Sequence, residues 1–164
     1  MQLTYRDNNM TDAKSLDFDQ ATFEISLTNV ETSGRTFDDV VVEGIASGIP
    51  PEVLTRMKEL WGKTQELGTE VIYIGKIIVI KIIDFLKANP KLTASLAIGG
   101  AVYLLSNSIP WIGPWLAPLL GCVTSLGVLV SSTSLEEAIA IAKNFFQLLI
   151  DVFNTLANRW SLAK

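Results

Sequence analysis

Hydrophobic positions are distributed unevenly along this chain of 164 residues. The segment from Leu92 to Leu135 contains no Asp, Glu, Lys, Arg or His. A membrane-spanning helix needs about 20 apolar residues, so this run is long enough for two. Prolines, Gly113 and two tryptophans interrupt it between residues 106 and 115, where they are expected to break a helix. The pattern predicts an uncharged membrane helical hairpin within residues 90–132, with arms at 92–105 and 115–131.

The first arm of this predicted helical hairpin is short. About 14 residues rise roughly 21 Å in a helix, whereas the hydrocarbon core of a bilayer is about 30 Å thick. The sequence therefore leaves three alternatives open: the membrane thins around a spanning hairpin, the first arm begins before Pro90, or the hairpin is re-entrant and does not fully cross. Small residues, among them Gly99, Gly100 and Gly121, are expected to let its two arms approach closely.

Residues 50–89 show a helical period. When residues 51–88 are placed at 100° steps around an axis, all their charged side chains fall within about half of the circumference. The prolines at 50 and 51 suit a helix start, and Pro90 ends the pattern. The segment is predicted to be one long amphipathic helix of roughly 55 Å.

Residues 133–164 predict a second amphipathic helix. Thr133 and Ser134, each followed three residues later by glutamate, offer two overlapping capping boxes. Polar residues of the following helix fall within about 120° of its circumference, and the remainder is apolar. An apolar face of that width is broader than a soluble surface helix requires.

Residues 1–49 differ from the rest of the chain. In residues 22–28, apolar and polar side chains alternate with the period of a half-buried strand. A turn composition follows at 31–34, and residues 35–44 can return as a second strand. The head is therefore predicted to be partly β, as a small β-hairpin, with disorder as an alternative for residues 1–20. The fold class as a whole is mainly α.

Charge distinguishes the head further. Residues 1–49 carry three basic and nine acidic side chains, and the whole chain has a net charge of −4. No basic surface with interleaved aromatic residues appears, so nucleic acid is not an expected partner. A protein partner could dock on the acidic head. Residues 1–20 are polar, so no cleavable signal peptide is expected and an internal segment would direct membrane insertion.

The residues that usually carry enzyme chemistry are scarce. The chain has no histidine, and its single cysteine, Cys122, lies in the apolar run. Neither clustered metal ligands nor a pairing of nucleophile and base can be assembled from the sequence. The chain is expected not to be an enzyme, and no cofactor or metal is predicted.

We expect a membrane-embedded homo-oligomer that forms a pore. Polar side chains inside a membrane raise the free energy of insertion unless they face water or one another. The polar residues on one side of the helix over 133–164, which we call the polar stripe, are therefore expected to line a lumen. Tryptophans are enriched at the headgroup level of bilayers. The candidate lining residues are Lys143, Gln147, Asp151, Asn154, Asn158, Lys76 and Lys81, and the candidate interface residues are Trp111, Trp115 and Trp160. In hydropathy plan, this layout is similar to the α-helical pore-forming domains of the colicin type, and holin-like lysis proteins share a plan with two spans.

Two alternatives remain open at this stage. The first is a non-conducting structural membrane subunit, or anchor of a virion or larger complex, in which the stripe packs on a neighbouring helix. The second is a water-soluble helical bundle whose uncharged run is its own core. Dependence on detergent separates the bundle from the membrane proteins, and dye release from liposomes separates the pore from the anchor.

Overall fold

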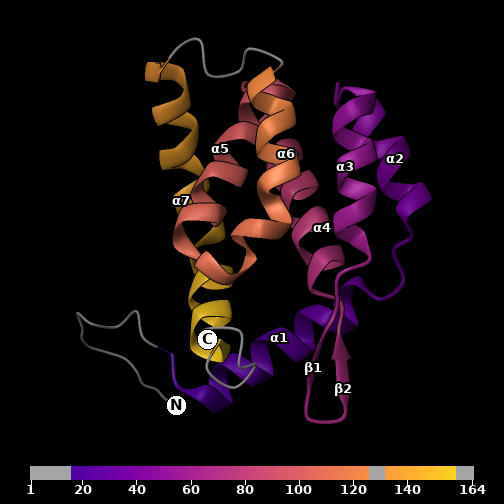
Figure 1. Ribbon diagram of the computed structural model, residues 1–164, viewed down its shortest axis with the longest axis vertical. Helices are drawn as coiled ribbons and strands as arrows, with labels where there is room; N and C mark the ends of the chain where they lie inside the picture. Colours follow the sequence, from indigo (N-terminus) through magenta and orange to yellow (C-terminus); the bar gives the residue numbers. More distant parts are fainter. Residues whose placement is uncertain (1–15, 126–131, 158–164) are drawn as a thin grey trace.

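The computed structural model of the protein describes residues 16–125 and 132–157 (Figure 1). The described chain is mainly helical, as predicted, with one small antiparallel sheet of two strands. Its elements in chain order are α1 (Phe18–Thr32), α2 (Phe37–Ala46), α3 (Pro51–Trp61), β1 (Gln65–Leu67), β2 (Glu70–Ile72), α4 (Ile74–Ala88), α5 (Ala94–Ser108), the 3-10 helix η2 (Pro110–Ile112), α6 (Gly113–Ser125) and α7 (Ser132–Leu156).

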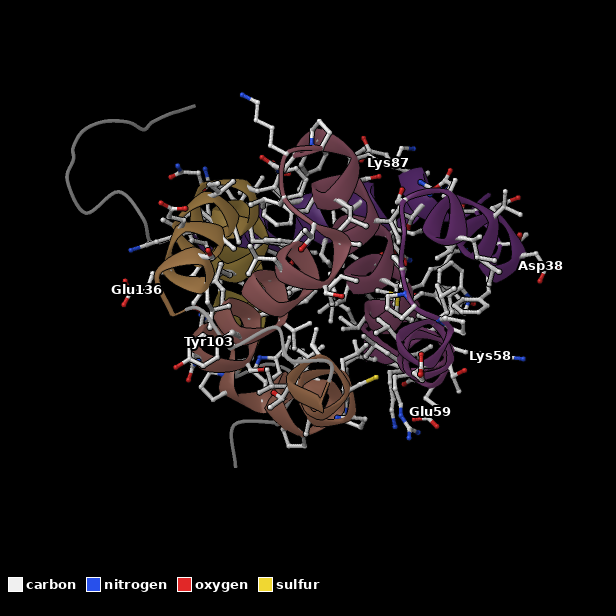
Figure 2. The ribbon with its side chains drawn as sticks, turned by 90° about the horizontal axis from the view of Figure 1, so that it is seen from above. Asp38, Lys58, Glu59, Lys87, Tyr103 and Glu136 are labelled. Atoms are coloured by element: carbon white, nitrogen blue, oxygen red, sulfur yellow. The ribbon has the colours of Figure 1, made fainter. Side chains whose placement is uncertain are left out.

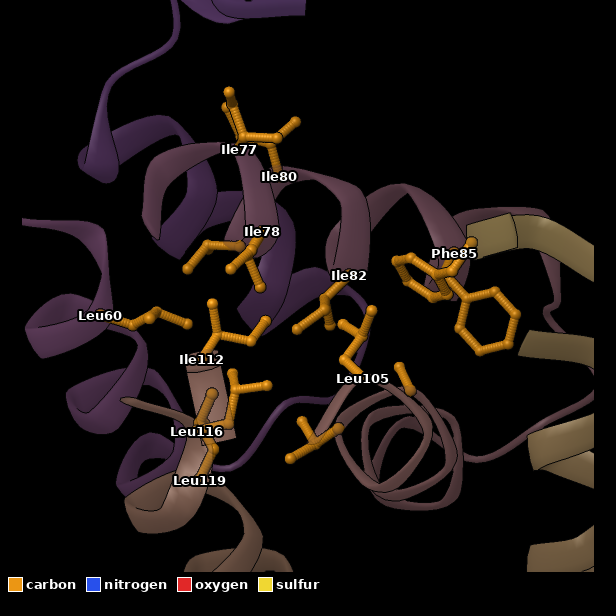
Figure 3. Packing of buried hydrophobic residues seen from close by; sticks show 14 of the residues in the cluster. Leu60, Ile77, Ile78, Ile80, Ile82, Phe85, Leu105, Ile112, Leu116 and Leu119 are labelled. Carbon is orange, nitrogen blue, oxygen red and sulfur yellow. The ribbon is translucent and has the colours of Figure 1, made fainter. Parts of the chain in front are cut away.

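Helix α4 lies in the middle of the hydrophobic core. Ten of its fifteen residues are buried, and the helix contacts α1, α2, α3 and α5. A helix that is apolar on nearly every side is stable only when other elements surround it. Figure 3 shows part of the resulting cluster, where side chains of α4, such as Ile78 and Ile82, meet side chains of α3, α5 and α6. Since burying one such side chain contributes about 1.5–3 kcal/mol, α4 makes a large contribution to folding.

The predicted long helix over residues 51–88 is wrong. The chain forms α3, then the β1–β2 hairpin, and then α4. Gly68, at the turn of the β-hairpin, has φ +65°, a conformation that favours glycine. The helical period continued across this segment only because its few apolar residues happened to stay in phase. The better signal was a glycine turn next to the β-branched and aromatic residues Val71, Ile72 and Tyr73.

The predicted β-hairpin of the head is also wrong, because residues 18–46 form α1 and α2. Each helix begins with a capping box, between Asp17 and Gln20 and between Thr36 and Asp39. The alternation that resembled a strand arises because α1 is apolar on two faces. Ile25 is buried, whereas Phe23, two residues before it, is exposed on another side of the helix.

The uncharged run forms helices α5 and α6, joined by η2. The axes of the two helical parts, Ala94–Ser108 and Pro110–Thr124, are bent by 118° at the break, and α5 contacts α6. Pro110 begins η2 and ends the preceding helix, as the breaking residues predicted. The end of the second predicted arm, at residues 126–131, lies outside the described residues.

Helix α5 packs most extensively against α7, and a glycine permits the contact. A Cβ atom added at Gly100 would lie 2.8 Å from Cβ of Ala138, closer than two side chains can approach. Gly121 on α6 has nothing within 4 Å of such an atom. Gly100 therefore serves the crossing of α5 with α7 and not the approach of α5 to α6, and Gly121 is not required by any close contact.

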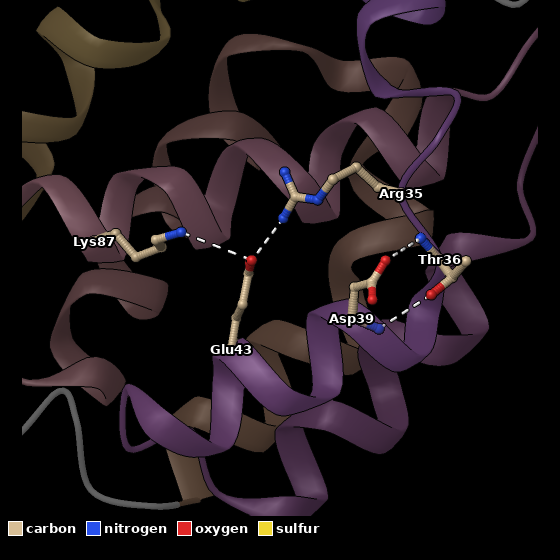
Figure 4. A network of polar contacts seen from close by, with 5 residues as sticks. All are labelled: Arg35, Thr36, Asp39, Glu43 and Lys87. Carbon is tan, nitrogen blue, oxygen red and sulfur yellow. Dashed lines mark hydrogen bonds and ion pairs between the residues drawn. The ribbon is translucent and has the colours of Figure 1, made fainter.

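Charged side chains lie on the outside of the fold. Figure 2 shows Asp38, Lys58, Glu59 and Glu136 at its periphery. On α2, Glu43 accepts from Arg35 at 2.7 Å and lies 3.8 Å from Nζ of Lys87 at the end of α4 (Figure 4). Such partly exposed ion pairs contribute at most about 1 kcal/mol each, so they orient α2 more than they stabilise it.

Two side chains of α1 hold the β-hairpin in place. The Asn29 side-chain amide donates to the carbonyl of Val71 at 2.9 Å, and its oxygen accepts from the N–H of Tyr73 at 3.0 Å. Ser26 donates to the Glu70 carboxylate at 2.8 Å. The β-hairpin is thereby fixed along α1, at the start of the central helix α4.

Candidate functional site

Helix α7 is the longest helix described, and it carries most of the polar positions that the sequence singled out. Within the described residues, it is the single helix that is both long and apolar enough to cross a membrane, over Ser134–Leu156. Its mean hydropathy of 1.2 is modest, and 39% of the qualifying window is buried inside the fold; the core helix of a soluble protein can meet the same criterion. The bent pair α5–α6 meets the same criterion only when its two parts are taken together.

The polar stripe of α7 consists of Lys143, Gln147, Asp151 and Asn154. Lys143 and Asn154 are exposed, and the other two are half-buried. The Gln147 amide donates to the Asp151 carboxylate at 2.9 Å. The Asn154 amide donates to the Ser108 carbonyl at the end of α5, also at 2.9 Å. These four candidates therefore lie along one side of α7, beside the side that packs on α5. Asn158 and Trp160 lie outside the described residues.

Lys76 is not near the stripe. It lies in the first turn of α4, where its ammonium donates to the Ser33 carbonyl at 3.1 Å. The same group lies 5.5 Å from the ring centroid of Trp61 and 5.9 Å from that of Tyr73, within the range of cation–π attraction. These contacts connect the start of α4 to the end of α1 and to the end of α3.

Lys81 lies on the other side of α7, in a groove between α1, α4 and α7. The groove has a volume of about 270 Å³. The α7 residues that line it are centred about 170° around the helix from the stripe, at 100° per residue, so they lie nearly opposite the stripe. Its walls are mostly apolar, and the lining residues are Glu24, Ile25, Thr28, Lys81, Phe145, Phe146, Leu148, Leu149 and Val152. The structure therefore does not bring Lys76 or Lys81 together with the stripe.

The sequence did not predict this groove between α1, α4 and α7. Its α1 wall had been predicted as a strand, so the proximity of Glu24 to α7 could not be foreseen. The available signal was the spacing of Phe23, Leu27 and Val30, which is the i, i+4, i+7 pattern of one helix face.

Trp111 and Trp115 are half-buried within the fold and pack on each other. Their ring centroids are 5.7 Å apart with planes at 85°, the edge-to-face arrangement that aromatic pairs favour. Trp111 also lies 5.8 Å from Phe153 of α7. In this compact form, the two rings join the α5–α6 connection to α7, and whether they reach a membrane interface stays a prediction.

The described residues hold few groups for other chemistry. Over 16–125 and 132–157, no group of three or more Asp, Glu or Cys side chains could hold a metal ion. Cys122 is a half-buried free thiol on α6. The geometry of this site therefore consists of an amphipathic helix, an uncharged helix pair and an apolar groove.

Comparisons with protein families, with curated proteins and with solved structures find no match to this chain.

Proposed function

We propose that this protein inserts into membranes and oligomerises into a pore, and that the compact fold is the form that carries the uncharged α5–α6 pair before insertion. The observation that carries the proposal is that one helix, α7, combines a membrane-spanning length with a polar stripe along one side. The proposal concerns a second arrangement of the same helices, in which α7 has left α5.

The length of α7 fits a bilayer. Its 23 residues from Ser134 to Leu156 would rise about 35 Å, which exceeds the hydrocarbon thickness of about 30 Å. A helix of this length can cross with a modest tilt. The crossing helix would carry Lys143, Gln147, Asp151 and Asn154 through the hydrocarbon.

The stripe supports oligomerisation. A charged side chain at the centre of a bilayer costs about 2.5–3.5 kcal/mol on insertion scales, so Lys143 and Asp151 need water or a partner there. One helix cannot enclose water. Several copies with their stripes facing a common axis would hydrate the polar groups and place the broad apolar side of α7 against lipid.

The uncharged pair makes insertion feasible for α5 and α6. In water, their apolar side chains need cover, which α3, α4 and α7 provide. In a bilayer, lipid provides the same cover, so the separation of α7 from α5 would not expose apolar surface to water. The charged residues of α1–α4 would stay at the aqueous side.

One observation favours the alternative of a non-conducting membrane anchor. Three polar side chains of the stripe already have partners within the chain, through the Gln147–Asp151 and Asn154–Ser108 hydrogen bonds. A stripe that is satisfied in this way needs no lumen. The two functions make different predictions for leakage.

Release of a trapped dye from liposomes tests the pore. We expect the protein to cause release, and we expect Asn154→Leu to lower single-channel conductance severalfold while vesicle binding persists, because one polar group is lost from the lining. Asn107→Leu on α5 is the matched control, since its exposed amide likewise donates to one carbonyl, that of Tyr103 at 2.9 Å. This control should conduct as the parent does.

Three outcomes decide between the functions. Vesicle binding without leakage at any lipid composition or pH would remove the pore and leave the anchor. Leakage that Asn154→Leu and Gln147→Leu both leave unchanged would show that α7 is not the lining. A protein that stays monodisperse in plain buffer and never binds vesicles would be the soluble helical bundle.

A further inference from the structure

More than half of the exposed large hydrophobic side chains in the described residues lie on two helices that contact each other, α1 and α7. Seven of the eleven exposed large hydrophobic side chains in the described residues belong to α1, β2 and α7, and α1 contacts both of the others. We define the α1–α7 face by the six of them on the two helices, Phe23, Leu27, Val30, Ile141, Phe145 and Leu148. An exposed apolar surface of this kind marks a site of interaction.

The arrangement of these side chains is regular. On α1, Phe23, Leu27 and Val30 follow the i, i+4, i+7 spacing of one ridge, and their exposed fractions are 64%, 42% and 66%. On α7, Ile141, Phe145 and Leu148 repeat the same spacing. The groove of about 270 Å³, which we call the hollow, lies between the two helices; Phe145 and Leu148 of the α7 ridge line it, and Glu24, Ile25 and Thr28 form its α1 wall.

Two opposite charges line the hollow. Glu24 lies on the α1 wall, and Lys81 reaches the hollow from α4; both are partly exposed. Among residues 16–125 and 132–157, neither side chain makes an ion pair within 4.0 Å or a side-chain hydrogen bond. An acid and a base that share one largely apolar hollow without pairing can each accept a partner of opposite charge from outside.

We propose that the α1–α7 face is the interface between two copies of this chain, in which Glu24 of each copy pairs with Lys81 of the other. In a two-fold symmetric dimer, every contact is made twice, so a surface must be complementary to itself. A face with ridges, a hollow, one acid and one base meets that condition. The α1 ridge of one copy, with Leu27 beside Glu24, would enter the hollow of its partner and bring the carboxylate to Lys81.

The charges favour a second copy over a lipid surface as the occupant. Besides Glu24, α1 carries Asp19 and Glu31, which anionic headgroups would repel. Glu24 and Lys81 would also enter hydrocarbon unpaired if a lipid surface covered the face. Between two copies they pair with each other, and the apolar ridges shelter them from solvent, which strengthens the attraction. This inference goes beyond the proposed pore, because it concerns the compact form in water and is tested without a membrane.

Charge reversal in two separate copies gives a sharp test. Glu24→Lys sets a lysine against Lys81 of the other copy, and Lys81→Glu sets a glutamate against Glu24 of the other copy, so each variant alone should dimerise at least tenfold more weakly than the parent. Mixing the two variants in equal amounts should restore a dimer, because position 24 of either copy then meets the opposite charge at position 81 of the other. Sedimentation velocity or light scattering coupled to gel filtration measures the masses.

Matched controls separate pairing from net charge and from folding. Glu52→Lys and Lys58→Glu make the same changes on exposed positions of α3 and should dimerise as the parent does. Phe23→Ser removes an exposed side chain, so it should leave the monomer folded and weaken the dimer. Three results would each overturn the proposal. The parent protein could stay monomeric at concentrations up to about 100 μM. The single reversals could dimerise as fully as the parent, or the equal mixture of the two variants could stay monomeric.

Discussion

Gly75 lies where α3 and α4 approach each other closely, and it leaves almost no room for a side chain. It lies in the first turn of α4 and donates to the Lys63 carbonyl at 2.9 Å, which joins the start of α4 to the end of α3. A Cβ atom at this position would overlap the Leu60 carbonyl oxygen. A glycine is therefore required by close approach, and not by its dihedral angles.

Gly75→Ala should destabilise the fold by about 1–3 kcal/mol, because α3 and α4 must move apart to accept one methyl group. Gly62→Ala is the matched control. Gly62 has φ −82° and nothing within 4 Å of an added Cβ, so alanine there should leave stability unchanged or raise it by up to about 1 kcal/mol. Denaturant unfolding measures both variants. Equal stabilities for the two would contradict the contact seen at Gly75.

Asp39 makes the stability of α2 sensitive to acid. Hydrogen bonds from the backbone amide and the hydroxyl of Thr36 lower the pKa of its carboxyl below the usual 3.8, and the charge of Arg35 adds a smaller effect (Figure 4). A group whose pKa is depressed by folding stabilises the fold above the unfolded pKa and loses that contribution as pH falls through the folded one. The cap should therefore contribute fully at neutral pH and fade below about pH 4.

Asp39→Asn should reduce that pH dependence. The variant should be less stable than the parent at pH 7, and the difference should shrink as the pH approaches 3. Asp38→Asn, one residue earlier and exposed, is the control and should follow the parent across the same range. Unfolding curves at pH 7, 5 and 3 give the comparison. A gap between Asp39→Asn and the parent that stays constant with pH would contradict the assignment.

The fate of Lys76 and Lys81 shows what single residues in a sequence can reveal. Both were placed on a pore lining because a continuous helix would have carried them on its polar side. The turn at Gly68 interrupts the helix, so the helical period of α3 does not continue into α4. The direction in which a side chain of α4 points therefore cannot be deduced from its distance in sequence to α3. The stripe on α7 was predicted from within one uninterrupted helix, and its described members do lie along one side.

At the scale of elements, helix-breaking residues predicted more reliably than apolar alternation did. The break at Pro110 was foreseen from its missing donor. Thr133 and Ser134 were predicted to cap the last helix, but α7 begins at Ser132, so both lie inside it. Helix α1 carries a capping signal in Asp17 and Gln20, but the alternation of Phe23, Ile25 and Leu27 concealed it. A helix with two apolar faces imitates a strand locally, and only a tertiary contact reveals which face is inside.

The α5–α7 crossing gives an element-scale test of the proposed insertion. Gly100→Cys with Ala138→Cys, in a Cys122→Ser background, places two Cβ atoms 2.8 Å apart before relaxation. A disulfide needs about 3.8 Å, so the helices must separate by about 1 Å to accept it. If α7 must leave α5 to insert, the oxidised protein should release no dye, and a reductant should restore release to the level of the Cys122→Ser parent.

The oxidised and reduced forms of this variant have the same sequence, so the reduced form is the control for the oxidised form. Far-UV circular dichroism of the oxidised protein should match that of the parent if the bond is accommodated. Undiminished leakage from a fully oxidised sample would mean that α5 and α7 stay together in the membrane, and the proposed rearrangement would have to be abandoned.

At the scale of the whole molecule, helical content was predictable and the identity of the central helix was not. The uncharged run at 92–135 appeared to be the segment in greatest need of shelter. Instead, α4 occupies the centre, although it contains Lys76, Lys81, Asp84 and Lys87. Those four side chains emerge through gaps between the surrounding helices and are all at least partly exposed. Sequence periodicity cannot foresee such gaps, because they depend on how neighbouring helices are spaced.

The contact of Asn29 with β2 has a consequence for the behaviour of this protein in solution. Its side-chain amide donates to the carbonyl of residue 71 and accepts from the N–H of residue 73. One residue of a neighbouring parallel strand would make the same two hydrogen bonds. An open strand margin is a template on which other chains can add and grow into fibrils. Asn29 occupies two backbone groups on the outer side of β2, so a further strand could pair there only after Asn29 has left.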